Sequence, residues 1–148
     1  MTAALLDTAP LEVANRLRPV LLHLNRHLRR EAQAQGISAG QISMLSAICD
    51  NPGIGVAELA AREGMASPSV TTHIDRLERA GYVTRDRELE GDRRRVGLRI
   101  TQSGTKLLRA VRSRRTAWLA SRLESLSLEQ REAIAAAVEP LAALVTRS

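Results

Sequence analysis

The sequence contains very few aromatic residues: only Tyr82 and Trp118 are present, and phenylalanine is absent. Proteins that bind single-stranded nucleic acid stack bases on aromatic side chains, so this class of partner is disfavoured. A single cysteine, Cys49, excludes an internal disulfide and a zinc site made of several thiolates. Sparse cysteine is typical of a reducing compartment, so we expect the protein in the cytoplasm.

Long apolar runs are also missing. No stretch approaches the ~20 apolar residues of a membrane span, so we expect no membrane partner. The first residues lack the charged region and apolar core of a signal peptide. No glycine-rich phosphate loop, nucleophile elbow or placed carboxylate pair is present. We therefore expect neither enzymatic activity nor a cofactor nor a bound metal.

Lysine is nearly absent as well: Lys106 is the only lysine in the sequence. The formal net charge is nevertheless +6, and it is carried by arginine. Guanidinium groups contact phosphate and guanine in a bidentate manner. A basic chain indicates nucleic acid, an anionic membrane surface or an acidic partner, and the alternative is a solvated basic surface.

Apolar residues at helical spacing predict a helix over 11–35, in which Pro19 would introduce a kink or set the effective start. Ser38 and Gln41 have the spacing of a capping box, so a second helix is expected to begin there. Its predicted buried stripe consists of Ile42, Leu45, Ile48 and Cys49. A very short strand is possible at 54–56.

A short helix over 57–62 is followed by a second helix that ends before Gly81. Ser67 is predicted to cap this second helix, with Pro68 at its first helical position. A short helix, a turn and a capped helix predict a helix-turn-helix.

Alternating apolar residues then predict two strands, over 82–85 and 95–100, joined by a charged tip. A helix capped by Thr101 follows over about 102–126, and a last helix over 128–145 is opened by a capping box. The predicted fold class is mainly α with a small β-hairpin wing, forming a winged helix-turn-helix lobe. We assign residues 1–35 to an N-terminal arm and dimerisation helix, 36–101 to the DNA-binding lobe, and 102–148 to C-terminal dimerisation helices.

The first helix and the last two carry more apolar surface than so small a lobe can bury. The economical explanation is that they pack against a second copy of the chain, which predicts a two-fold symmetric homodimer.

The helix over 67–79 carries short polar side chains on its outer face. Such a helix fits the major groove of double-stranded DNA with its N-terminal end nearest the bases. Its charged residues cancel, so it can read base edges but supplies little electrostatic affinity. The alternative is an ordinary amphipathic helix with a polar outer face. The expected contact residues are Ser67, Ser69, Thr71, Thr72, His73 and Arg76.

The affinity is expected from arginines at the hairpin tip. Arginine on a thin tip can enter the narrow minor groove, where the negative potential is deepest. Asp92 lies two residues before Arg94 and could hold that guanidinium by an ion pair. The alternative is a solvated hairpin tip. The wing residues expected at DNA are Arg85, Arg87, Asp92, Arg93, Arg94 and Arg95.

The run from Asp92 to Gly104 resembles the wing signature of the MarR family of bacterial transcription regulators. That signature is Asp, any residue, Arg, an alternating apolar strand, and then Thr-x-x-Gly. The segments 56–60 and 69–83 are also similar to that family. The resemblance covers roughly residues 11 to 146 in helix order and spacing.

This resemblance implies a dimeric winged-helix protein on pseudo-palindromic DNA, with Arg94 in the minor groove supported by Asp92. It implies that the helix over 67–79 reads the major groove. Many members of the family are repressors released by phenolic or aromatic acids that bind between the dimerisation helices and the DNA-binding lobe. Some sense oxidants through a cysteine, and a few sense zinc.

The remaining polar candidates bear on these sub-classes. Cys49 lies on an apolar stripe, where cysteine is usually inert packing. His23 and His27 share one helix face, but no third zinc ligand is evident. The pair could instead line a pocket for a small anionic effector. The expected function is a ligand-released repressor; the alternatives are a protein-binding adaptor or a sequence-indifferent DNA binder.

Overall fold

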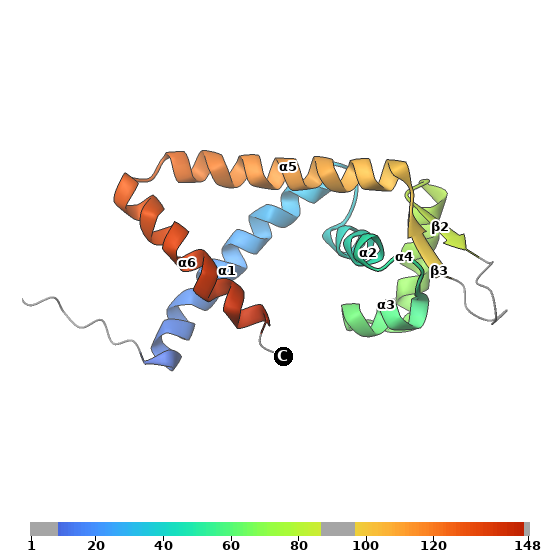
Figure 1. Cartoon of the computed structure of the whole chain (residues 1–148), viewed down its shortest axis with the longest axis horizontal. Helices are drawn as coiled ribbons and strands as arrows, with labels where there is room; N and C mark the ends of the chain where they lie inside the picture. The colour runs from blue at the N-terminus through green and yellow to red at the C-terminus, as the bar shows by residue number, and fades with distance from the viewer. Residues whose placement is uncertain (1–8, 87–96, 147–148) are drawn as a thin grey trace, which may run out of the picture. The chain divides into compact units, whose positions relative to one another are not determined.

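A computed structural model describes residues 9–86 and 97–146 of the chain, and it is mainly helical with one small sheet (Figure 1). The predicted fold class, a helical protein with a winged helix-turn-helix lobe, is confirmed. The elements in chain order are α1 (Pro10–Gln33), α2 (Ala39–Asp50), β1 (Ile54–Gly55), α3 (Val56–Glu63), α4 (Ser67–Arg79), β2 (Val83–Asp86), β3 (Gly97–Ile100), α5 (Gln102–Glu124) and α6 (Leu128–Thr146).

Both predicted capping boxes are present. The Ser38 hydroxyl oxygen accepts from the Gln41 N–H at 3.1 Å, and the Gln41 side-chain oxygen accepts from the Ser38 N–H at 3.1 Å. Ser127 and Gln130 make the same reciprocal pair at 3.2 and 3.0 Å. Each box satisfies two amides that a helix start otherwise leaves without partners, which is why α2 and α6 begin where the sequence indicates.

The structure decides one alternative about the helix starts and corrects one prediction. Helix α1 runs from Pro10 through Pro19 without a new start. The N-cap of α4 is Ala66, and no side chain caps this helix. Ala66 is extended, with φ −70° and ψ 140°, and its carbonyl accepts from the Ser69 N–H at 3.0 Å. Ser67 is therefore already helical and cannot cap, so the prediction that it does was wrong.

The three strands form an antiparallel sheet in the order β1-β3-β2. In the β2–β3 pair, Val83 lies opposite Ile100 and Asp86 lies opposite Gly97. The possible short strand at 54–56 exists as β1, which pairs with β3 through Ile54 and Leu98. Strand β3 therefore pairs with both β1 and β2, and its pairing with β1 attaches the wing strands to the lobe.

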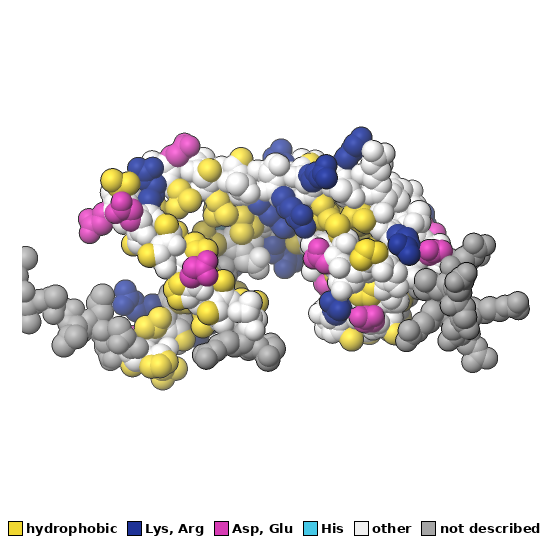
Figure 2. All heavy atoms as spheres, in the orientation of Figure 1, with side chains coloured by type: hydrophobic (Ala, Val, Ile, Leu, Met, Phe, Trp, Pro, Cys, Tyr) yellow, Lys and Arg dark blue, Asp and Glu magenta, His cyan; other side chains and the backbone are white. Residues whose placement is uncertain are grey.

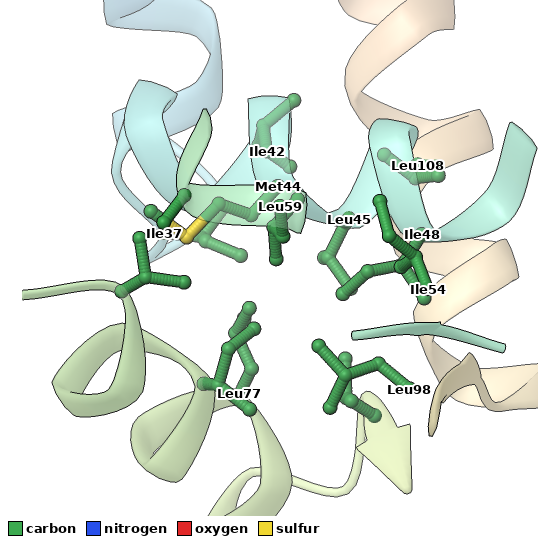
Figure 3. Close-up of a cluster of buried hydrophobic side chains, with 14 of the residues drawn as sticks. Ile37, Ile42, Met44, Leu45, Ile48, Ile54, Leu59, Leu77, Leu98 and Leu108 are labelled. Carbon is green, nitrogen blue, oxygen red and sulfur yellow. The ribbon is translucent and has the colours of Figure 1, made fainter. Parts of the chain in front are cut away.

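The core lies between α2, α3, α4, β3 and the first turns of α5. Figure 3 shows Leu45, Leu77 and Leu98 pointing toward one another from three different elements. Met44 is also fully buried, although the predicted stripe of α2 omitted it. Helix α2 packs against α1, α3 and β3, so more than one of its faces is covered. Cys49 is half-buried against the core rather than inside it.

The described residues form two compact units, one ending at Arg112 and the other beginning at Ser113. The first contains the lobe, and α5 contributes Leu108 and Val111 to its core. The second unit contains the remainder of α5 and the whole of α6, and α6 has no buried residue.

None of the described helices is both long and apolar enough to cross a bilayer.

Candidate nucleic-acid interface

Helix α4 has one buried and one exposed face. Val70, Ile74 and Leu77 are 0%, 0% and 1% exposed, at the four- and three-residue spacing of one helix face. On the exposed side, Ser67, Ser69, Thr72 and Arg76 reach solvent, whereas Thr71 and His73 are half-buried. The six residues predicted for the major groove therefore lie on one short helix that the core holds from behind.

The end of α4 is fixed by a Schellman motif. The Tyr82 N–H donates to the Leu77 carbonyl, and the Gly81 N–H donates to the Glu78 carbonyl, each at 2.9 Å. Gly81 has φ +81°, a left-handed conformation that glycine adopts without a steric penalty. The chain thus turns directly from the helix into β2, which sets the distance between the two.

The two threonine hydroxyls of α4 bond to their own helix. Thr71 donates to the Ser67 carbonyl at 3.0 Å and Thr72 donates to the Pro68 carbonyl at 3.1 Å. Their hydrogens are engaged, but each oxygen keeps lone pairs that can accept from a base amino group. The methyl groups can contact the methyl of thymine. In this arrangement the threonines act as acceptors and apolar contacts rather than donors.

His73 and Arg76 offer two different groups. The Nδ1 atom of His73 is buried and has no hydrogen-bond partner among the described residues. Arg76 is exposed and, like Arg79, forms no ion pair within the described part of the chain. A free guanidinium can bind phosphate or the acceptor edge of guanine in a bidentate manner.

Of the predicted wing residues, only Arg85 belongs to the described part. Its side chain turns back to α4: one guanidinium nitrogen lies 2.6 Å from the Asp75 carboxylate and the other pairs with Glu78. On the neighbouring strand, the Arg99 Nε lies 3.0 Å from the carboxylate of Asp86. The prediction that Arg85 contacts DNA is untested, but the structure gives this guanidinium two carboxylate partners within the protein.

The other wing residues lie outside the described residues: Arg87, Asp92, Arg93, Arg94 and Arg95. They fall between Asp86 and Gly97, which are cross-strand neighbours at one end of the sheet.

The pair His23 and His27 lies on α1, with ring centroids 5.7 Å apart and ring planes tilted by 34°. The two rings are thus neighbours on one face, as their four-residue spacing predicted. Across the described residues, no group of three or more His, Cys, Asp or Glu side chains converges as a metal site would require.

Thr101 caps α5 as the sequence predicted, because its hydroxyl oxygen accepts from the Gly104 N–H at 3.1 Å. The same hydroxyl donates to the Gly81 carbonyl at 2.6 Å, and the Thr101 N–H donates to the Tyr82 carbonyl at 3.0 Å. This second role, which joins the end of α4 to the start of α5, was not predicted from the sequence. No local sequence pattern indicates it, because Gly81 lies twenty residues before Thr101.

Helices α3 and α4, joined by a short turn and followed by β2 and β3, define a winged helix-turn-helix DNA-binding protein. Comparison with known proteins gives the family. Residues 37–96 match the model of the MarR family. The chain is 31% identical over 137 residues to the uncharacterized HTH-type transcriptional regulator Mb0904 of Mycobacterium bovis, covering 92% of this chain and 94% of that one. This chain belongs to the MarR family of transcription regulators.

Solved structures share the fold over most of the chain. A MarR family protein from Bacillus stearothermophilus is 26% identical, with a TM-score of 0.77 over 97% of this chain and 100% of that chain. A mutant of Staphylococcus aureus MepR, bound to an oligodeoxyribonucleotide, is 20% identical, with a TM-score of 0.69 over 90% and 97% of the two chains. The latter likeness shows a common fold.

Proposed function

We propose that this MarR-family transcription regulator acts as a homodimer on a pseudo-palindromic operator in double-stranded DNA. We further propose that it represses transcription until a small anionic aromatic effector releases it. The observation that carries the proposal is α4, whose apolar face is buried and whose exposed face presents short polar side chains and arginine beside two carboxylates. The family is one of transcription regulators rather than enzymes.

In this proposal α4 enters the major groove and reads base edges. Thr71 and Thr72 offer acceptor oxygens and methyl groups, and Arg76 offers a free guanidinium. These groups match the donor, methyl and acceptor patterns of the major groove. The wing adds Arg94 in the adjacent minor groove, held by Asp92, and this assignment rests on the sequence and the family resemblance.

The homodimer is supported by apolar surface that the single chain leaves exposed. On α1, Leu11 is 75% exposed and Val20 is 53% exposed. On α6, Leu144 and Val145 are 68% and 81% exposed, and apolar side chains are visible on the surface of that helix (Figure 2). Exposed apolar side chains that cluster on a surface often mark a site of protein–protein contact. Packing of these helices against a second copy of the chain, related by a two-fold axis, would cover this apolar surface.

The effector is proposed to act by changing the distance or angle between the two lobes. It would need to bind one arrangement more tightly than the other to shift the equilibrium. His23 and His27, adjacent on α1, are the polar groups proposed to meet its carboxylate. The protein is expected to work in the cytoplasm, where its operator is.

The test is a footprint on the DNA that flanks the protein's own gene, followed by a titration of the protected site and of random duplex DNA at low and moderate salt. A single protected palindrome, bound more tightly than random DNA, is expected. Uniform protection would indicate a sequence-indifferent binder instead. Absence of any salt-dependent binding would leave the adaptor role, because phosphate contacts always produce a salt slope.

A further inference from the structure

The arginine on β2 contacts the recognition helix through both arms of its guanidinium. One nitrogen of Arg85 lies 2.6 Å from the Asp75 carboxylate, and the other pairs with the Glu78 carboxylate. The Arg85 side chain is 22% exposed, whereas those of Asp75 and Glu78 are 39% and 40% exposed. The two carboxylates are three residues apart, so they project from one side of α4 and a single planar fork bridges them.

This contact changes the charge that α4 presents. The helix carries Asp75 and Glu78 together with Arg76 and Arg79, so its side-chain charges cancel on their own. Carboxylates near DNA phosphates repel them, and the repulsion weakens binding. With Arg85 placed on the two acids, the cations Arg76 and Arg79 remain as the charges free to act on DNA.

The same contact fixes the wing. Arg85 pairs across the sheet with Leu98, which is fully buried, so its backbone is held to the lobe. Its guanidinium then ties β2 to the second half of α4. A direct contact of Arg85 with phosphate would compete with two ion pairs, one of them a close, half-shielded pair with Asp75.

We infer that Arg85 is a positioning residue rather than a DNA-contacting one: it fixes the base of the wing to the recognition helix and neutralises the two carboxylates there. The inference rests on the proposed function, since it concerns how tightly the protein binds duplex DNA. It reassigns one residue that the sequence placed among the wing contacts.

The experiment measures the affinity of the full-length protein for its footprinted DNA site as a function of salt. Arg85→Gln is expected to weaken binding about tenfold, because it exposes two carboxylates and loosens the wing. The slope of log affinity against log salt should stay that of the wild type. A lost phosphate contact would lower that slope by about 0.9 instead, and this result would overturn the inference.

A rescue variant separates the two roles further. Arg85→Gln combined with Asp75→Asn and Glu78→Gln removes the unpaired carboxylates, and its affinity should recover to within about threefold of wild type. The matched control combines Arg85→Gln with Glu124→Gln and Glu129→Gln, which changes the net charge equally on other helices. No recovery in the rescue variant, or equal recovery in the control, would contradict the inference.

Thermal unfolding of each variant checks that the lobe stays folded. If Arg85→Gln unfolds, the double variant Asp75→Asn/Glu78→Gln, which keeps Arg85, is measured in its place. The double variant frees the wing from α4, so the ratio of the affinity for the operator to the affinity for random DNA should fall. An unchanged ratio would contradict the positioning role. A wild-type protein that binds no DNA would refute the proposed function itself, which is a different outcome from any of these.

Discussion

At the scale of single residues, Thr101 shows how one side chain can fix the junction between two helices. Its hydroxyl donates to the Gly81 carbonyl, just after α4, and accepts from the Gly104 N–H in the first turn of α5. Both groups belong to helix ends, where backbone donors and acceptors lack partners within the helix. The recognition helix and the helix that leaves the lobe are therefore joined through a few atoms.

We expect Thr101→Val to lower the free energy of unfolding by about 1–2 kcal/mol, because it removes a cap and leaves the Gly81 carbonyl without this donor. Thr105→Val is the matched control. The Thr105 hydroxyl donates only to the Thr101 carbonyl, which already accepts from the Thr105 N–H at 2.9 Å. Chemical denaturation of both variants checks this, and equal losses would show that the junction has no special role.

Residue-level roles were predictable from sequence only where the partner is near in the chain. Both capping boxes join residues three apart, so their spacing revealed them. Arg85 meets carboxylates seven and ten residues away on another element, and only the packing of β2 on α4 determines that contact. The same reasoning explains why the local cap of Thr101 was predicted, whereas its bond to Gly81, twenty residues away, was not.

At the scale of elements, the close approach of α5 to the turn between α4 and β2 requires a residue without a side chain. A Cβ at Gly104 would overlap the Tyr82 carbonyl oxygen and lie 2.7 Å from a carbon of Ile100. Neither neighbour can move freely, because the Tyr82 oxygen is backbone in the turn after α4 and Ile100 packs against the core. Glycine in the first turn of α5 thus permits the packing that orients this helix.

We expect Gly104→Ala to destabilise the protein by about 1–3 kcal/mol through this overlap. Gly40→Ala, also in the first turn of a helix, would meet only the Ser38 hydroxyl oxygen at 3.9 Å. That control should be neutral or should stabilise by up to about 1 kcal/mol, because alanine restricts the unfolded chain. Thermal unfolding measures both, and a loss of the same size in the two variants would refute the close-packing argument.

Most elements were predictable because hydrophobic periodicity and caps are local. The helix over 67–79 was predicted to end where α4 ends, and its buried residues Val70, Ile74 and Leu77 agree with their spacing. The start of that helix was misassigned, since Ser67 has the side chain of a cap and only the backbone shows that Ala66 holds the position. Strand β1 is two residues long and is formed by its pairing with β3. No local sequence pattern specifies that pairing.

At the scale of the whole molecule, the proposed dimer depends on the end helices. On α6, Ile134 and Val138 lie four residues apart and are 45% and 56% exposed. The first half of α5 belongs to the lobe through Leu108 and Val111, and its second half lies in the other compact unit with α6. The proposed dimerisation region of residues 102–148 therefore shares α5 with the DNA-binding lobe.

We expect light scattering to give twice the 16.2 kDa chain mass. Val138→Lys should shift the protein toward the monomer, because burying an unpaired charge in an apolar interface is costly. Glu132→Lys, on the opposite side of α6 by helical spacing, should leave the mass unchanged. A wild-type monomer, or two variants that behave alike, would contradict the proposed interface.

The most direct test of the proposed function is the spacing of the two half-sites. Two recognition helices held by one dimer should fit half-sites about 10 base pairs apart, on one face of the duplex. Inserting about five base pairs, half a helical turn, between the half-sites places them on opposite faces. Titration should then show affinity falling to that of random DNA at the same salt concentration. Unchanged affinity for the inserted site would contradict a dimer that reads DNA with two α4 helices.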